Sequence, residues 1–384
     1  NMAQLELTPK ANWGRKILLV ALGLALLGNY LRGTQLPVDV SGLSPLILFR
    51  ISQLGVGLAT IKILFIDANS WRFKAGFLAM SLFLYYVGSN AHLLDIFFYF
   101  VILVAAKDED YRWLLRCYLI EVAVIMLSLA LLTFGGILND MTMVRPGGTL
   151  RMSFGSVTPS DFAAHVFHWL VAYFCYRNFK LSWIEYLVSL VATWGVFRFT
   201  GTRLDLILMA VTLVLAVSYP KLKKLINYLD GWSLGAIMLV YLGFNLAINY
   251  LFTPKWTWFR RVDELLSHRL TYGQLALQKP LTLFGRYFRE NGNGKFNPHQ
   301  PYFFIDSSFV RLLAMQGILL FTCFVIMLIF LAWRFKAERT YSLLLGLGLV
   351  LLSAAIDHHL WELSYNFIFL ASLTDNQHFI VKRK

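Results

Sequence analysis

Membrane-length apolar runs recur along this chain of 384 residues, and they restrict its fold more than any other feature. Two examples are ILLVALGLALLGNYL, which begins at residue 17, and LLAMQGILLFTCFVIMLIFLAW, which begins at residue 312. A transmembrane β-barrel needs short alternating strands, and continuous apolar runs do not supply them. Only 15% of residues are charged and the mean hydropathy is +0.60, which excludes an ordinary soluble domain. The sequence therefore predicts an all-α, polytopic membrane protein.

The spacing of apolar runs and polar breaks predicts about twelve transmembrane helices, with eleven to thirteen as the range. The predicted helices cover residues 15–31, 45–66, 73–89, 91–106, 112–134, 157–176, 183–199, 203–219, 232–251, 308–334, 340–356 and 361–380. The three cysteines all lie inside apolar runs without the spacing of a disulfide framework or a zinc site. We expect them to be small buried side chains.

Basic residues fall in alternate loops, which predicts the orientation of the chain. If the first residues are cytoplasmic, the Lys- and Arg-rich loops all face the cytoplasm, and so do both termini. The opposite, outer face then receives residues 32–44, 135–156, 200–202, 252–308 and 357–362. Arginines on that outer face depart from the preference of Lys and Arg for cytoplasmic loops, so they need a separate explanation.

The longest polar interruption is residues 252–308, which we predict to be a large outer loop between helices in 1–251 and C-terminal helices in 309–384. Its first part, residues 256–278, has the periodicity of one amphipathic helix on the membrane surface. A segment broken by Gly and Pro follows, and residues 302–306 re-enter the membrane, so the loop could form a lid. It holds eight Lys and Arg against four Asp and Glu, which indicates an anionic ligand; a solvated face or anionic lipid headgroups are the alternative.

No nucleotide-binding or metal-binding motif is present in the sequence. Asp357, His358 and His359 resemble a metal cluster, but adjacent histidines on a helix point about 100° apart. We therefore predict no metal, no cofactor and no nucleic-acid partner. Converging arginines are instead the expected receptor for a pyrophosphate, because the guanidinium group forms paired bonds to phosphate oxygens.

Several ionisable residues lie inside predicted membrane helices, where they are costly unless they face the bundle interior. The set is Glu121, Asp161, His165, His168 and Asp205. Asp161 and the histidines fit either interhelical hydrogen bonds or the lining of a cavity. For Asp205 we expect a salt bridge to Arg198 or Arg203.

Four segments carry a resemblance to a known family: RMSFGSVTPSDFA at 151–163, TGTRLDLIL at 200–208, SHRLTYGQLALQKPLTLFG at 267–285 and FIDSSFVRLLAMQGIL at 304–319. In sequence and order they resemble the landmarks of Wzy-type polysaccharide polymerases, in the superfamily shared with O-antigen ligases. The resemblance implies a GT-C-like glycosyltransferase that works without a metal at the outer face of the bacterial cytoplasmic membrane. Its donor and acceptor would be undecaprenyl-pyrophosphate-linked oligosaccharide repeat units for capsule, exopolysaccharide or O-antigen. The implied partners are the lipid bilayer, a flippase and a chain-length regulator.

The resemblance also implies roles for particular residues. Those that match the family arginines best are Arg151, Arg203 and Arg269, with Arg145, Arg261 and Arg311 as secondary candidates for the donor pyrophosphate. His299 is the candidate base, although it lies further from the helix-start motif than the ligase histidine, and an exposed loop histidine is the alternative. Asp306 fits a helix N-cap, or else hydroxyl binding and base chemistry. His268 is the reserve candidate.

Two other functions remain open at this point. An O-antigen-type ligase would use the same donor and a different acceptor, and the sequence does not distinguish the two. A flippase or other transporter of lipid-linked oligosaccharides would also need a cationic cavity. Transporters usually carry internal repeats with broken helices in both halves, and no convincing repeat is visible here.

Overall fold

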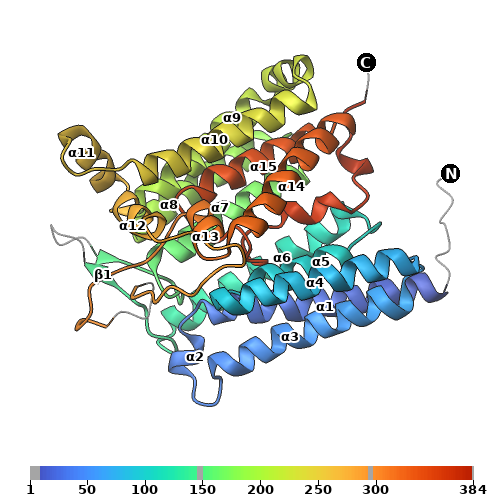
Figure 1. Cartoon of the computed structure of the whole chain (residues 1–384), viewed down its shortest axis with the longest axis horizontal. Coiled ribbons are helices and arrows are strands. Elements are labelled where there is room, and N and C mark those ends of the chain that lie inside the picture. The colour runs from blue at the N-terminus through green and yellow to red at the C-terminus, as the bar shows by residue number, and fades with distance from the viewer. Residues whose placement is uncertain (1–8, 145–149, 293–296, 383–384) are drawn as a thin grey trace.

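The computed structural model describes residues 9–144, 150–292 and 297–382, and it is a bundle of helices that run between two ends (Figure 1). Within these ranges, six helices are long and apolar enough to cross a membrane. They are α1 (Pro9–Arg32), α3 (Pro45–Ile61, continued by the π-helical turn Lys62–Ile66), α6 (Tyr111–Phe134), α9 (Arg203–Tyr228), α10 (Gly231–Tyr250) and α14 (Ile318–Ala337). The predicted class, a polytopic helical membrane protein in a lipid bilayer, is confirmed.

The other elements are shorter or less apolar. They are α2 (Leu36–Asp39), α4 (Trp71–Ala91), α5 (Asp95–Ala105), α7 (Pro159–Tyr176), α8 (Trp183–Thr200), α11 (Thr257–Leu265), α12 (Arg269–Leu277), α13 (Ser308–Ala314), α15 (Tyr341–Ala354) and the two-stranded hairpin β1 (Met143–Val144) and β2 (Leu150–Arg151). Capping residues set several of the starts. Ser182 and Glu185, for example, form a capping box at the first turn of α8.

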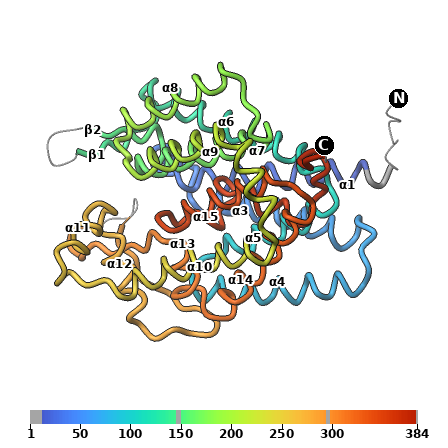
Figure 2. The backbone as a smooth tube through the Cα atoms, turned by 90° about the horizontal axis from the view of Figure 1, so that it is seen from above, coloured from blue at the N-terminus to red at the C-terminus, as the bar shows by residue number. Residues whose placement is uncertain are grey.

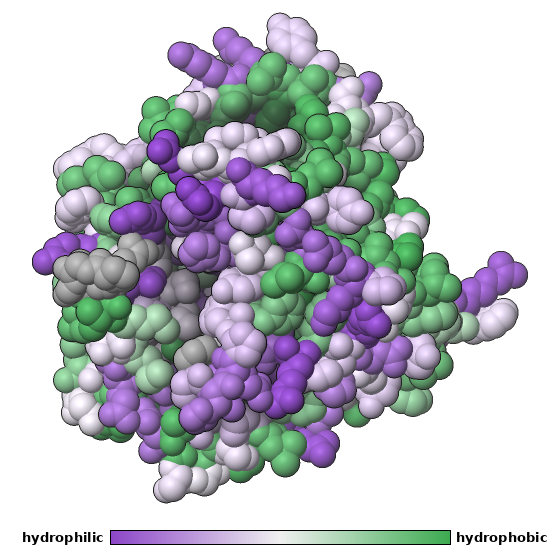
Figure 3. Space-filling view, turned by 60° about the vertical axis from the view of Figure 1, so that its left-hand side comes forward, coloured by the Kyte–Doolittle hydropathy of each residue, from purple (hydrophilic) through white to green (hydrophobic). Residues whose placement is uncertain are grey.

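The two ends of the bundle differ in character. The described residues of 252–307, strands β1 and β2 and helix α2 lie at one end, which we call the loop end, whereas α1 begins at the other end, where the described chain also finishes (Figures 1 and 2). Figure 3 shows hydrophilic residues gathered over the loop end, with hydrophobic residues along the sides of the bundle. This distribution suits a protein whose sides face lipid and whose loop end faces water.

The predicted helix over 361–380 is wrong. This stretch is irregular, with only two short 3-10 turns, Ile368–Ser372 and Gln377–Phe379, although most of it is buried. Its carbonyl groups accept hydrogen bonds from tyrosines of α5 and α6, such as Tyr99 to Asn366 and Tyr118 to Ser364. Irregular backbone is tolerated at membrane depth only where protein surrounds it and satisfies its polar groups, as here.

Two further predicted helices are broken in the structure. The single amphipathic helix over 256–278 is the pair α11 and α12, because Ser267 and His268 between them have positive φ angles. The single helix over 308–334 is the pair α13 and α14, which separate at Gly317. Both breaks lie at the loop end, and each one changes the direction of the chain next to the predicted site.

The break at Gly317 also anchors the long loop. The amide groups of Ile318 and Leu319 donate to the carbonyl groups of Thr282 and Leu283, and Gly285 packs directly on the break. The structure therefore brings together two of the segments singled out in the sequence, the one that ends in LFG and the one that contains Gly317.

Gly317→Ala is expected to lower the free energy of unfolding by about 3 kcal/mol. Gly317 has a φ of +94°, and an added Cβ would lie 2.4 Å from the amide nitrogen of Gly285 and 2.7 Å from the carbonyl oxygen of Leu283. Thermal unfolding in detergent measures the effect. Gly348→Ala in α15 is the control, because nothing lies within 4 Å of its added Cβ. Equal melting temperatures for the two variants would contradict the prediction.

Candidate functional site

Four helix starts meet at the loop end: those of α7, α9, α12 and α13. The turn that follows α15 lies among them, and we call this turn, residues 355–362, the DHH turn. Ion pairs connect the parts, because Arg269 of α12 faces Asp306 and Asp357, and His359 of the DHH turn faces Asp161 of α7. Helix N-termini carry partial positive charge, which favours the acidic groups gathered here.

Arg269 is at the centre of this cluster. Its Nε donates a hydrogen bond of 2.6 Å to the Ile356 carbonyl group, and its Nη1 donates one of 3.1 Å to Leu266. Its Nη2 lies 3.7 Å from Asp306 and 3.9 Å from Asp357, which is within ion-pair range but beyond hydrogen-bond length. The backbone contacts fix the guanidinium group, while Nη2 remains directed at carboxylates.

The start of α12 is held by a buried carboxylate, Asp263 of α11. It accepts hydrogen bonds from the amide groups of Leu270 and Thr271 and from the Thr271 hydroxyl group. His268, a predicted site residue, is largely exposed, and its Nδ1 lies 3.3 Å from Asp263. Asp263 thus serves as the cap that positions Arg269.

Asp306 is not the helix N-cap that its sequence position allowed. The cap of α13 is Ser307, whose hydroxyl oxygen accepts from the Val310 amide group. Burial raises the pKa of Asp306 to about 6, against the lowering effect of Arg269 and with a further rise from Asp357. A carboxyl group that titrates close to neutrality and is free of capping is suited to accept a proton from a substrate hydroxyl group.

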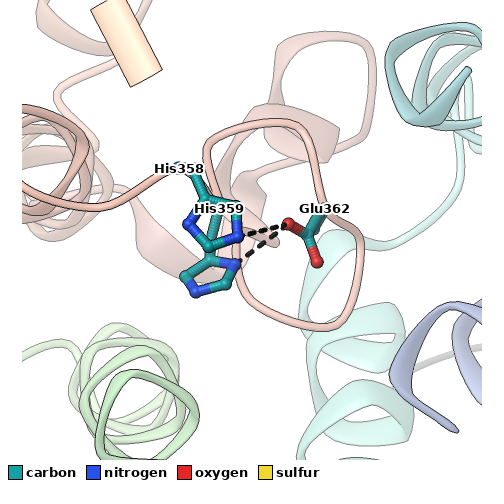
Figure 4. A group of neighbouring side chains, drawn as sticks. All are labelled: His358, His359 and Glu362. Carbon is teal, nitrogen blue, oxygen red and sulfur yellow. Dashed lines mark hydrogen bonds and ion pairs between the residues drawn. The ribbon is translucent and has the colours of Figure 1, made fainter. Parts of the chain in front are cut away.

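The DHH turn places His358, His359 and Glu362 side by side (Figure 4). The Nδ1 of His359 lies 3.0 Å from Glu362 Oε1, and its Nε2 lies 3.5 Å from Asp161 Oδ1. The break predicted over 357–362 is a turn in the structure, so the 100° separation of adjacent helical side chains does not apply, and the ligand atoms of the two histidines and Glu362 fall within 4.8 Å of one another.

A metal ion is one possible partner for that trio, but the carboxylates favour a charged ring. Burial opposes protonation of His359, yet Glu362 and Asp161 outweigh burial and raise its pKa to about 10. Without a metal, the ring is then favoured in the form that carries a proton on each nitrogen at neutral pH. It stacks on Tyr365 with ring centroids 3.7 Å apart, and Tyr365 stacks on His165 at 3.6 Å. His359 is thus a fixed positive charge behind the site.

Arg311, predicted to bind substrate, makes its contacts within the protein. Its Nη2 lies 2.6 and 2.7 Å from the two carboxylate oxygens of Glu290, and its Nε donates to the Ile305 carbonyl group. The side chain is buried beneath Phe304. This ion pair, in which one nitrogen contacts both carboxylate oxygens, ties Glu290 of the long loop to α13.

Arg151 and Arg203 lie together at another corner of the loop end. The Nε of Arg151 donates a 2.6 Å hydrogen bond to the Thr200 carbonyl group, and its side chain packs on Gly201. Arg203 begins α9 two residues later and is exposed. Asp205, one half-turn further, is buried and attracts Arg269 electrostatically. No ion pair between Asp205 and either Arg198 or Arg203 occurs within the described ranges, so that predicted salt bridge is wrong.

Of the remaining predicted residues, Arg261 and His299 make no described contact with this cluster. Arg261 is exposed on α11, and Arg145 falls outside the described residues. His299 is exposed on the turn 297–300, and no contact among described residues joins its side chain to Arg269 or Asp306.

Asp161, Asp357, His359 and Glu362 were not among the predicted site residues. Three of them lie in the run DHHLWE, between two apolar stretches, and Asp161 is a carboxylate in the first turn of α7. These two features were the signal that the sequence offered. The assumption of a transmembrane helix over 361–380 obscured it.

Comparison of the chain with protein-family models, curated proteins and solved structures gave no match.

Proposed function

We propose that this protein is a glycosyltransferase that joins undecaprenyl-pyrophosphate-linked oligosaccharide repeat units, with its active site at the loop end and the loop end on the outer face of the bacterial cytoplasmic membrane. The observation that carries the proposal is the pair formed by Arg269 and Asp306, a fixed guanidinium group 3.7 Å from a carboxylate. The pair lies where helices that can cross a membrane end. A lipid-linked donor could present its pyrophosphate and first sugar at this level.

In the proposed reaction, Asp306 takes the proton of an acceptor hydroxyl group as that oxygen attacks the anomeric carbon of the donor sugar. The bond between the anomeric carbon and the pyrophosphate oxygen breaks, and the lipid pyrophosphate leaves with the bonding electrons. Nη2 of Arg269 stabilises the charge that develops on the leaving group, and Arg203 with Arg151 is suited to the outer phosphate. Pyrophosphate is already a good leaving group, so positioning and charge neutralisation can supply much of the acceleration.

The fixed charge of His359 fits this scheme as a positioning element. Asp161, Asp205, Asp306, Asp357 and Glu362 crowd one region, and an anionic donor would be repelled unless their charge were offset. Arg269 and the His359 imidazolium supply two positive charges among them. A ligase that uses the same donor needs the same charged side chains. Only the identity of the acceptor therefore distinguishes a ligase from a polymerase.

The proposal is tested with purified protein in liposomes that contain the lipid-linked repeat unit. A ladder of longer glycans is the expected product, and Asp306→Asn should remove it, whereas Glu264→Gln on the exposed face of α11 should not. Transfer to a different acceptor without a ladder would indicate a ligase. Movement of the lipid across the bilayer without any transfer would overturn the proposal in favour of a transporter.

His299→Ala is expected to keep transfer within about threefold of the native rate, because the side chain is exposed and makes no described contact with Arg269 or Asp306. Initial rates of glycan transfer measure the effect, with Asp306→Asn assayed in parallel. A loss for His299→Ala as large as that for Asp306→Asn would make His299 the base and require the loop to move over the site.

A further inference from the structure

A polar cavity of about 70 Å³ lies beside the candidate site, between the start of α5, α13 and the DHH turn. The residues of its lining that can form hydrogen bonds include Asp95, Arg311, Gln316, His358, Trp361 and Glu362. The cavity has room for about five groups of the size of water. It borders Ser308, two residues after Asp306, and His358, whose ring contacts Phe304. Residues on its lining are thus close neighbours of the proposed base along the chain, and two of them, His358 and Glu362, belong to the DHH turn.

Several groups of this lining have hydrogen-bonding capacity that no described residue uses. The side chain of Gln316 is buried and takes part in no hydrogen bond among the described residues. Nε1 of Trp361 is also buried without a described partner. The hydrogen bonds of Asp95 and Glu362 involve one carboxylate oxygen each, Oδ1 and Oε1. Buried donors and acceptors left unpaired are costly, so the lining is suited to a ligand that offers both.

The charges of the lining are already balanced within the protein. Arg311 is paired with Glu290, Asp95 with Arg32, and Glu362 with His359. A free anion would meet two carboxylates, and a free cation would meet Arg311, so neither is favoured. A neutral ligand with several adjacent hydroxyl groups fits best. Each of the two carboxylates has one oxygen, and the Gln316 amide has both its polar atoms, outside the hydrogen bonds of the described residues, and the Trp361 indole adds an apolar face.

We propose that this cavity is a glycan subsite that binds the hydroxyl-bearing edge of one sugar ring. This inference rests on the proposed function in one respect, namely that the sugar belongs to a lipid-linked substrate. The ring could come from the donor glycan or from the acceptor glycan, and both present the same chemistry. Gln316 and Trp361 are then specificity-determining residues, because they recognise hydroxyl groups and take no part in the proton transfer.

Two conservative variants test the subsite. Gln316→Met removes the amide group with little change in volume, and Trp361→Phe removes the N–H group while an aromatic ring remains. Trp194→Phe on the exposed face of α8 is the matched control. Melting temperatures in detergent show whether each variant is folded.

Transfer kinetics distinguish the two sources of the ring. The acceptor is the repeat unit on a lipid monophosphate, which lacks the pyrophosphate leaving group, and the donor is the natural pyrophosphate. Each subsite variant is expected to raise KM about fivefold to tenfold for one of the two lipid substrates, either the acceptor or the donor. The same variant should change kcat less than threefold. A higher KM for the monophosphate lipid assigns the cavity to the acceptor, and a higher KM for the pyrophosphate lipid assigns it to the donor.

Binding without turnover separates this inference from the proposed function. Saturation-transfer NMR with the free repeat-unit oligosaccharide should show contact with the native protein and with Trp194→Phe, and a reduced signal with both subsite variants. That pattern would support the subsite even in a protein that shows no transfer. Folded subsite variants with native oligosaccharide binding and native KM for both lipids would overturn it.

Discussion

Asp306→Asn is expected to reduce the rate of glycan transfer by about 10²-fold to 10⁴-fold, the usual contribution of a general base. The asparagine keeps the size of the side chain and removes its capacity to accept a proton. Because Ser307 forms the cap of α13, the loss should not come from unfolding of that helix. Transfer assays in liposomes and melting temperatures in detergent measure the two effects separately. A native transfer rate in the folded variant would exclude Asp306 as the base.

The same carboxyl group predicts a pH dependence for the native protein. Its pKa of about 6 means that the ionised base is lost as the pH falls through 6, so the transfer rate should fall with it. The effect of pH on the free energy of unfolding has the opposite direction. A folded-state pKa above the unfolded value of about 3.9 makes this group stabilising below pH 4, and that contribution is lost as the pH rises through 6. In Asp306→Asn this component of the pH dependence of the melting temperature should be absent.

Arg269→Met is expected to lower both stability and transfer. Removal of the guanidinium group leaves the buried Asp357 and the partly buried Asp306 without their cation, which costs about 3 kcal/mol. Transfer should also fall by about 10²-fold to 10³-fold, because charge on the departing pyrophosphate is no longer stabilised. The control is Arg260→Met on α11, where the arginine is exposed and its ion pair with Glu264 is loose.

A double variant separates the two effects of Arg269. Arg269→Met combined with Asp357→Asn removes one cation and one carboxylate, so the melting temperature should recover in part. Transfer should stay low, because the positive charge that faces the leaving group is still missing. Recovery of transfer together with stability would show that Arg269 serves only the fold.

Much of the helical framework could be predicted because its signals are local. Ser44 before Pro45, Ser70 before α4, and the Ser182 and Glu185 pair each mark a helix start in the sequence, and each caps a helix in the structure. The stretch 361–380 has the length and composition of a membrane helix, yet distant partners decide its conformation. The hydroxyl groups of Tyr99 and Tyr118, which a local pattern does not include, satisfy its backbone.

The candidate site was only partly predictable for the same reason. Arg269 and Asp306 were predicted from their motifs, and the structure brings them to 3.7 Å. Asp357 approaches Arg269 from a segment 88 positions later in the chain, and His359 meets Asp161 across an even longer separation. Sequence spacing does not report such contacts. His299 matched the expected order of motifs, yet its side chain is exposed and makes no described contact with the pair.

The irregular crossing by residues 361–380 has a consequence for how the protein is made. A helix can enter the bilayer with its backbone hydrogen bonds already formed, but this stretch depends on partners in α5 and α6. Its backbone is satisfied only when it packs against those helices. We therefore expect the turn that carries Asp357 and His359 to take its final place only after α5 and α6 have assembled.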